Sequence, residues 1–569
     1  MIKEDQVLTK EKVLVSKKIC RPTWMAHFIV LIALILCQLI WFGPIIRKIG
    51  FYLDDWSTFA DLYAGQQNWQ SLLQISLRDP RIITRPIESI VYVGSWLAFH
   101  DQPFWHHLLN CFFEVMTAFV LYLVLCRLSG NRALAFIASL LMLVYPSHDA
   151  THYWVTTNTI TLSLAMYLLS LWQAVKAVQD EKRTCFLYSN LAFLASLLTY
   201  EAFLPLISIT GICLLFLYRK KYRWGDSWLK SVIALAPSLV GVLAIYYYQR
   251  VYLLEHLNKG FHHTLKFSLP HMFDVIQAGF SQTILPYAMS VFLLRAQESF
   301  CELNVFKCCT LALLAAIVAL TLFLISDDQN NLFHPYAFIG LGLTIMICSY
   351  AVFAASPEYS PVIDSIMNRI NIGASVGSAM ILSGLVGLLT GKQMKSRKAT
   401  SILLTAMVSP LIIFFILADW GWSIPWFRSW TFQKYIVSVV KNNKERFKNC
   451  DVVILANCKR YVMWSPLFDG SWDFQSMLRM YLGAPHINAT VVSDRLTITK
   501  NIVKDVSCGY LCAEYPFKRL MIFIPNPKQW IKIDSASEFI EAIQLHDRRL
   551  GITEDTIERW KKELLLANN

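Results

Sequence analysis

The chain has 569 residues, of which 55% are apolar and only 16% are charged. A soluble domain is about half apolar and about a quarter charged, so this composition excludes an ordinary soluble protein. The formal charge of +13 would suggest a nucleic-acid partner in a soluble chain. Here the basic residues lie mostly in short segments between apolar runs, where they set orientation in a membrane. We therefore expect the lipid bilayer, and no nucleic acid, as a partner.

Apolar runs near the length of a membrane-spanning helix recur over the first 420 positions. Each is long enough to cross ~30 Å of hydrocarbon, and they predict an α-helical polytopic membrane protein with about 11 transmembrane helices. The spans are expected at residues 24–45, 107–127, 132–147, 159–177, 186–199, 202–218, 231–252, 303–325, 337–355, 372–391 and 401–419.

Two further apolar pieces are ambiguous, because 87–100 is too short to span and 273–296 contains Pro286 and scattered polar groups. The distribution of charge distinguishes whether these two pieces span, since basic loops face the cytoplasm. If neither piece spans, all four basic loops lie on the cytoplasmic side; they are 127–132, 176–183, 219–230 and 392–398. The polar segment 1–23 is then cytoplasmic. This topology suits a multi-pass protein of a bacterial inner membrane.

The composition changes after about residue 425, where charges become frequent. Strand-like runs at Val452–Leu455, 490–492 and Leu520–Ile524 alternate with helical patterns, and Ser535 and Glu538 have the spacing of a capping box. We predict a transmembrane domain over 24–424 and a soluble α/β domain over 425–569, on the exterior side.

The first exterior loop, 46–106, carries two adjacent carboxylates, Asp54 and Asp55, among aromatic residues. They are read either as a solvated acid pair, or as a general base or a pair that binds an ammonium group or a metal. Neighbouring carboxylates repel, which raises the pKa of one of them and suits proton abstraction. Arg85 follows in the same loop, either as an interfacial arginine or as a clamp for phosphate, which guanidinium binds bidentately.

The next span begins with His107 and Asn110, which share one helix face with Glu114. A carboxylate inside a span is costly and marks a candidate site, although a structural hydrogen-bond cluster between helices is the alternative. His148, Glu201 and Arg369 are further candidates at the exterior ends of spans. Together these positions outline a polar cavity above an apolar bundle.

These motifs, in this order, resemble the GT-C superfamily of polytopic glycosyltransferases, and in particular bacterial relatives of the transmembrane, TPR-containing protein O-mannosyltransferases. The resemblance covers about residues 24–420. Its motifs are Asp54-Asp55, Arg85-Pro86, His107 with Asn110, Pro146 with His148, Glu201, and Arg369-Ile370. The chain departs from the family pattern at Glu114, where a second histidine is frequent, at Tyr200 in place of a lysine, and at Ile370 in place of an aromatic residue.

The resemblance implies a polyprenyl-phosphate-linked sugar as donor and inversion at its anomeric carbon. The acceptor would be a hydroxyl of a glycan, lipid or protein. Asp54 would act as base with Asp55 orienting it, and Arg85 and Arg369 would stabilise the departing phosphate. His107, Asn110, His148 and Glu201 would support these groups or contact the sugar. No metal ligands or cofactor motif are predicted, and a divalent metal is left open.

Two alternatives belong to other functional classes. A transporter or flippase for lipid-linked glycans predicts charged residues at mid-span and inverted repeats, neither of which is clear in this sequence. A membrane-anchored interaction protein would act through residues 425–569 and would not depend on the first exterior loop.

Overall fold

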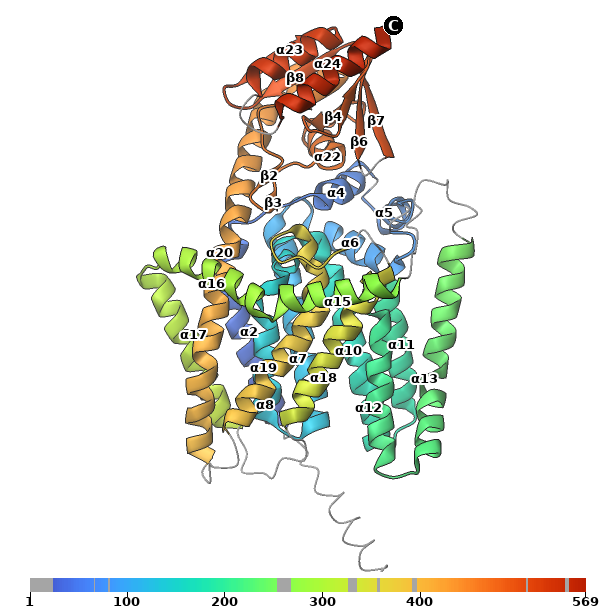
Figure 1. Ribbon diagram of the computed structural model, residues 1–569, viewed down its shortest axis with the longest axis vertical. Coiled ribbons are helices and arrows are strands. Elements are labelled where there is room, and N and C mark those ends of the chain that lie inside the picture. Colours follow the sequence, from blue (N-terminus) through green and yellow to red (C-terminus); the bar gives the residue numbers. More distant parts are fainter. Residues whose placement is uncertain are drawn as a thin grey trace, which may run out of the picture.

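The structure, a computed structural model, describes residues 24–65, 67–79, 82–252, 268–325, 335–355, 359–390, 397–507, 510–547 and 552–568. It consists of a helical bundle with a smaller α/β domain at one end (Figure 1). The expected cytoplasmic segment 1–23, and most of the basic loop 392–398, lie outside the described residues.

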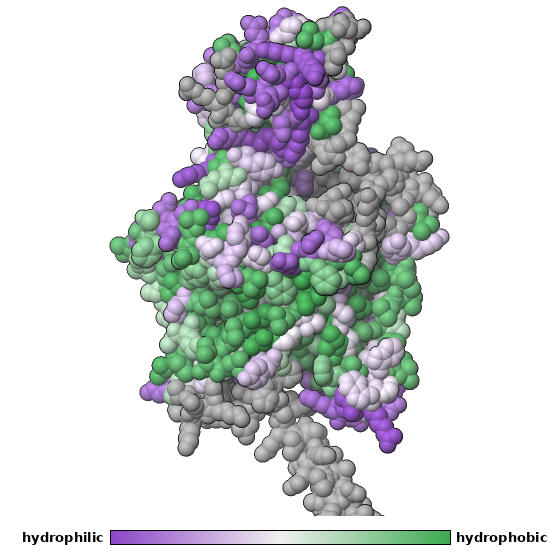
Figure 2. All heavy atoms as spheres, viewed as in Figure 1, coloured by the Kyte–Doolittle hydropathy of each residue, from purple (hydrophilic) through white to green (hydrophobic). Residues whose placement is uncertain are grey.

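Apolar helices form the bundle, and nine of those described are long and apolar enough to cross a membrane. They include α2 (Trp24–Trp41), α7 (Pro103–Ser129), α10 (Asn158–Gln179), α12 (Ile207–Arg219), α13 (Trp224–Tyr247), α17 (Val305–Ile325), α18 (Pro335–Ala351), α19 (Ile372–Thr390) and α20 (Arg397–Asn442). Two shorter apolar helices, α8 (Arg132–Leu143) and α11 (Thr184–Thr199), complete the set, and every predicted span coincides with one of these helices. On the face drawn in Figure 2, an apolar (green) belt crosses the bundle, and with these helices the chain is a multi-pass membrane protein.

The two ambiguous pieces form short helices at the end of the bundle that carries the α/β domain. Residues 87–100 fall in α6 (Pro86–Phe99), and 273–296 is divided between α15 (Leu269–Thr283) and α16 (Pro286–Cys301), which lie across the bundle (Figure 1). Proline at the first helical turn is favoured, but it cannot continue the preceding helix, so Pro286 separates the two.

Small residues let α18 and α19 cross closely. A Cβ placed on Gly342 would lie 2.6 Å from the carbonyl oxygen of Gly377, and one on Gly377 would lie 2.4 Å from that of Gly342. In a membrane, where lipid is as apolar as leucine, such close backbone packing is a main source of helix association.

Helix α20 has 46 residues and continues past the expected domain boundary at 424 into the α/β domain (Figure 1). The central sheet has the strand order β4-β1-β8-β9, with β1 (Val452–Leu455) parallel to β4 (Asn488–Val491) and β8 (Leu520–Ile524). The predicted strands are therefore confirmed. β1 and β8 are buried along their whole length, as expected for strands covered on both faces.

The rest of this domain comprises β9 (Gln529–Ile533), a separate antiparallel sheet, a hairpin and three helices. These are β5 (Leu496–Ile498), β6 (Ile502–Ser507), β7 (Tyr510–Pro516), β2 (Tyr461–Val462), β3 (Ser465–Pro466), α22 (Ser471–Leu482), α23 (Ala536–His546) and α24 (Glu554–Asn568). The Ser535 hydroxyl accepts a hydrogen bond from the Glu538 amide at the start of α23, as its capping spacing predicts.

Segment 46–106 lies between the bundle and this domain. It forms α4 (Asp54–Ala64), α5 (Trp69–Ser76) and α6, and α4 packs against α22 (Figure 1). The predicted site loop is thus a small helical layer rather than an extended loop.

Candidate functional site

Asp54 and Asp55 are the first two residues of α4. The chain enters this helix through Leu53, whose φ of 48° is unusual for a residue with a side chain. The sharp entry turns the two carboxylates in different directions, so that Asp55 is fully buried while Asp54 is half-buried.

Asp55 connects α4 to a distant turn. One carboxylate oxygen accepts the Tyr52 amide at 2.9 Å, and the other accepts the Thr156 amide at 2.8 Å. Burial raises the pKa of Asp55 from 3.8 to about 7, although the hydrogen bonds from Tyr52 and Thr156 act in the opposite direction. With both oxygens bonded to backbone, Asp55 is suited to positioning rather than to proton abstraction from an incoming group.

Arg85 and Glu201, predicted separately, form a bidentate pair. The Nε and Nη2 atoms of Arg85 donate to the two Glu201 oxygens at 2.8 and 2.7 Å. Nη1 lies 3.6 Å from an oxygen of Glu88, and the guanidinium lies over the Tyr200 ring at 4.2 Å. These contacts fix the plane of the guanidinium at a partly open position, since 22% of the Arg85 side chain is exposed.

Arg369 lies in a short 3-10 segment, η6 (Ile366–Asn371), and its guanidinium lies 5.1 Å from the centroid of the Trp154 ring. Arg369 and Arg85 both act electrostatically on Tyr359. Burial raises the pKa of Tyr359, as does Tyr200, while Arg369 and Arg85 lower it. Both guanidinium groups therefore act on one phenol.

The turn at residues 154–157 brings these groups together. Trp154 packs on Arg369, and the Thr156 amide binds Asp55. The Tyr92 hydroxyl lies 2.8 Å from the Thr156 carbonyl and 2.6 Å from the carboxyl of Glu88, the neighbour of Arg85. The acidic pair, the Arg85–Glu201 pair and Arg369 thus converge on a single turn at the domain-facing end of the bundle.

Three other predicted site residues lie in the interior of the bundle; they are His107, Asn110 and His148. His107 Nε2 is 2.9 Å from the Gly50 carbonyl, and Asn110 donates to the Thr151 carbonyl at 2.6 Å. His148 Nδ1 lies 2.9 Å from the Ser375 hydroxyl. All three side chains are at most 1% exposed, so their geometry is that of the structural cluster considered as the alternative.

A buried acidic group lies deeper in the bundle and includes one residue that the sequence reasoning missed. Glu114 accepts from Gln38 at 2.5 Å and lies 2.7 Å from His152 Nδ1. Asp149 accepts the Trp426 indole N–H at 3.1 Å. Asp419, on α20, is fully buried, and neither of its carboxylate oxygens has a hydrogen-bond partner among the described residues. The sequence could have identified Asp419 as a candidate, because a carboxylate that borders an apolar run is costly to place in a membrane.

Within the described ranges, no three His, Cys, Asp or Glu side chains are grouped as a metal site.

No protein-family model and no curated protein matches the sequence. Among solved structures, the chain is similar to ArnT from Cupriavidus metallidurans bound to undecaprenyl phosphate, at 12% identity, covering 82% of this chain and 86% of that chain, with a TM-score of 0.40. For ArnT in the apo state the identity is 10%, the coverage 79% and 83%, and the TM-score 0.39.

Proposed function

We propose that this protein is a membrane glycosyltransferase that moves a sugar from a polyprenyl-phosphate-linked donor to an acceptor hydroxyl. The observation that carries the proposal is the convergence of Asp55 and Arg369 on the turn at residues 154–157, to which the Arg85–Glu201 pair is linked through Glu88 and Tyr92. Asp54 lies beside Asp55 at the start of α4. This arrangement supplies a half-buried carboxylate and two guanidinium groups at one end of an apolar bundle. Those are the groups required for an anionic, lipid-borne donor.

The two arginines are assigned to the donor phosphate. Glu201 holds two donors of Arg85 in a fixed plane, and the remaining N–H groups of its fork are free of that pair. In the transition state, negative charge develops on the phosphate as the sugar leaves, so fixed guanidinium groups stabilise it more than they stabilise the donor. The Tyr200 ring beneath Arg85 and the Trp154 ring beside Arg369 keep both cations oriented.

Asp54 is assigned as the general base. It takes the proton of the acceptor hydroxyl while that oxygen attacks the anomeric carbon and forms the new glycosidic bond. The bond from this carbon to the phosphate oxygen breaks, and its electron pair leaves with the polyprenyl phosphate. Attack opposite the leaving group gives inversion. Asp55 fixes the entry of α4 through Tyr52 and Thr156, so that Asp54 keeps its position.

We place the reaction on the exterior face, with the N-terminus cytoplasmic, in the inner membrane of a bacterium. Three basic loops connect spans at the end of the bundle opposite the α/β domain (Figure 1); they are 127–132, 176–183 and 219–230. Positive loops are retained on the cytoplasmic side, which puts that domain and α4 outside. Since α22 packs on α4, the α/β domain is in position to present a glycan, lipid or protein acceptor.

The test is consumption of polyprenyl-phosphate sugars by the purified, full-length protein in lipid nanodiscs, with a cell-envelope extract as the source of acceptors. Release of polyprenyl phosphate by wild type but not by Asp54→Asn supports the proposal. The proposal would be contradicted if wild type left every donor of the panel intact. It would also be contradicted if Asp54→Asn turned over a donor as fast as wild type does.

A second candidate, transport of a lipid-linked glycan, is favoured by the buried group of Glu114, His152, Asp149 and Asp419. Transport predicts that sealed proteoliposomes move an intact donor across the bilayer without cleaving it. It also predicts that Asp419→Asn abolishes this movement while Asp54→Asn does not. If the protein is a glycosyltransferase, Asp54→Asn should abolish cleavage of the donor, while Asp419→Asn should not.

A further inference from the structure

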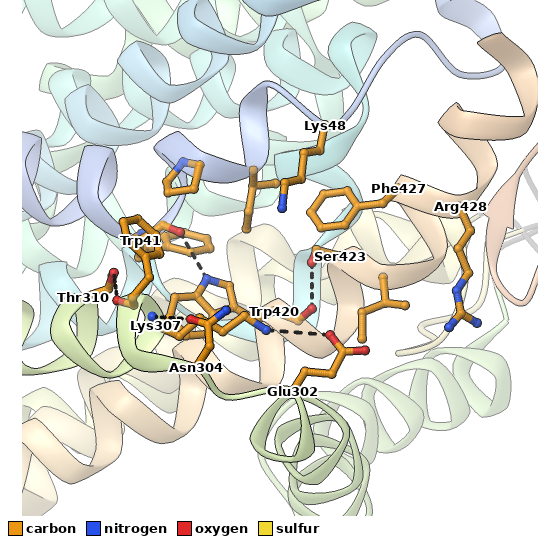
Figure 3. Close-up of a pocket in the computed structure, with 14 residues that line it drawn as sticks. Trp41, Lys48, Glu302, Asn304, Lys307, Thr310, Trp420, Ser423, Phe427 and Arg428 are labelled. Atoms are coloured by element: carbon orange, nitrogen blue, oxygen red, sulfur yellow. Dashed lines mark hydrogen bonds and ion pairs between the residues drawn. The ribbon is translucent and has the colours of Figure 1, made fainter.

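A pocket of about 350 Å³ opens at the edge of the bundle, away from the turn that carries the candidate site. It lies where three apolar helices meet, at the end of α2 with the chain that follows it, at the connection leading into α17, and along the middle of α20 (Figure 3). Its charged and aromatic lining consists of Trp41, Lys48, Glu302, Phe306, Lys307, Trp420, Phe427 and Arg428.

The charge in this pocket is mainly positive. Lys48, Lys307 and Arg428 contribute three cations, while Glu302 is the one acidic residue of its described lining. Glu302 lies 3.7 Å from Lys307, so it offsets part of one cation. No second acidic residue of this lining offsets Lys48 and Arg428. The pocket therefore carries a net positive charge, which attracts an anion.

Aromatic rings hold the lysines at the walls. Lys48 Nζ lies 5.5 Å from the centroid of the Phe427 ring, and Lys307 Nζ lies 5.7 Å from that of Trp420. Trp420 is itself fixed, because its indole N–H donates to the Trp41 carbonyl at 3.1 Å. Figure 3 shows the two lysines on opposite sides of the pocket, with Trp420 beside Lys307.

The depth of the pocket indicates that its ligand comes from the bilayer. Trp41 ends one candidate span and Val305 begins another, so the pocket lies at the level where hydrocarbon gives way to headgroups. Next to the pocket, Val305 and Phe306 are 81% and 65% exposed, which offers an apolar surface to an acyl or prenyl chain. Asn304 caps the first turn of α17, so amide groups at a helix N-terminus also face this region.

We propose that this pocket binds the phosphate headgroup of an anionic membrane lipid, with the lipid chains lying on the exposed start of α17. None of the residues that line the pocket belongs to the candidate active site, and the proposal does not depend on the proposed function. Lys48 and Lys307 bind the phosphate from two sides, and Arg428 contributes charge at the rim. An acidic segment of a partner protein is the competing occupant.

The experiment titrates the full-length protein, in detergent, with lipids of defined headgroup and counts bound molecules by native mass spectrometry. Phosphatidylglycerol and polyprenyl phosphate should bind to wild type, and phosphatidylcholine should bind more weakly. The double variant Lys48→Gln/Lys307→Gln should lose affinity for both anionic lipids by about 10-fold or more, because each lysine near an anionic lipid contributes several-fold.

Two variants serve as controls. Arg47→Gln removes an exposed cation adjacent to Lys48 that does not line the pocket, and it should bind lipid as wild type does. Lys48→Arg/Lys307→Arg keeps the charge and should retain binding. Equal loss in Arg47→Gln, or wild-type affinity in the double Gln variant, would overturn the proposal. Complete displacement of the lipid by millimolar inorganic phosphate would overturn the assignment to a lipid.

Discussion

Arg85 and Glu201 are 116 positions apart in the sequence, yet they form two parallel hydrogen bonds of 2.8 and 2.7 Å. The pair joins the start of α6 to the segment that follows α11, and Tyr200 packs its ring against the same guanidinium. These contacts hold the Arg85 guanidinium in one plane at the candidate site. Any phosphate bound there would meet a guanidinium whose plane is already set.

Replacing Arg85 by lysine is expected to lower kcat/KM for the lipid donor by about 10- to 100-fold, because an ammonium group cannot pair bidentately with Glu201 and phosphate. Arg85→Ala should lower it further. The measurement is release of polyprenyl phosphate by nanodisc-embedded protein. An Arg85→Lys enzyme with wild-type kcat/KM would remove Arg85 from the donor site.

Glu201→Gln tests whether the pair positions Arg85 or merely neutralises it. Gln keeps one acceptor oxygen but loses the bidentate geometry, so turnover should fall by several-fold with little change in thermal stability, because the pair is partly exposed. A large fall in melting temperature without a change in kcat/KM would mean that the pair serves the fold alone.

Asp54→Asn is expected to reduce sugar transfer by ~100-fold or more, since the amide keeps the shape of the side chain but cannot accept the hydroxyl proton. Folding should be retained, because Asp54 is only half-buried. Asp61→Asn is the matched control on the exposed part of the same helix and should leave transfer unchanged. Undiminished transfer by Asp54→Asn would exclude it as the base.

The pH dependence of stability should report the burial of Asp55. Burial raises its pKa from 3.8 to about 7, so the folded state holds this proton more tightly than the unfolded state does. The resulting stabilisation is complete below the unfolded pKa and is lost as pH rises through about 7. The melting temperature of wild type should therefore fall relative to that of Asp55→Asn between about pH 4 and about pH 7, the unfolded and folded pKa values of this group. A difference that does not vary with pH would contradict the raised pKa.

The close crossing of α18 and α19 predicts a contrast between two glycines on one helix. Gly342→Ala brings its Cβ to 2.6 Å from the Gly377 carbonyl oxygen, whereas Gly340→Ala meets nothing within 4 Å. Gly342→Ala should destabilise the protein by about 1–3 kcal/mol, the range for overpacking, and Gly340→Ala should not. Thermal unfolding of both variants in one detergent is the comparison, and equal melting temperatures would argue against the close crossing.

The sequence alone determined the features that depend on local composition. Apolar runs placed the membrane helices, because one span needs only its own residues to satisfy its backbone in lipid. Strand-like runs located β1 and β8, and Pro286 accounted for the interruption between α15 and α16. The motifs at Asp54-Asp55 and Arg85-Pro86 identified the segment where the candidate site is found.

Only the tertiary structure decided how these parts are paired. It made Asp55 the buried partner and Asp54 the more accessible one, joined Arg85 to Glu201, and put His107 behind the site on the Gly50 carbonyl. It also assembled the cationic pocket from three helices distant in sequence. Such contacts arise from helix packing over separations of many residues, and the local pattern of apolar and polar residues does not encode which side chains will meet.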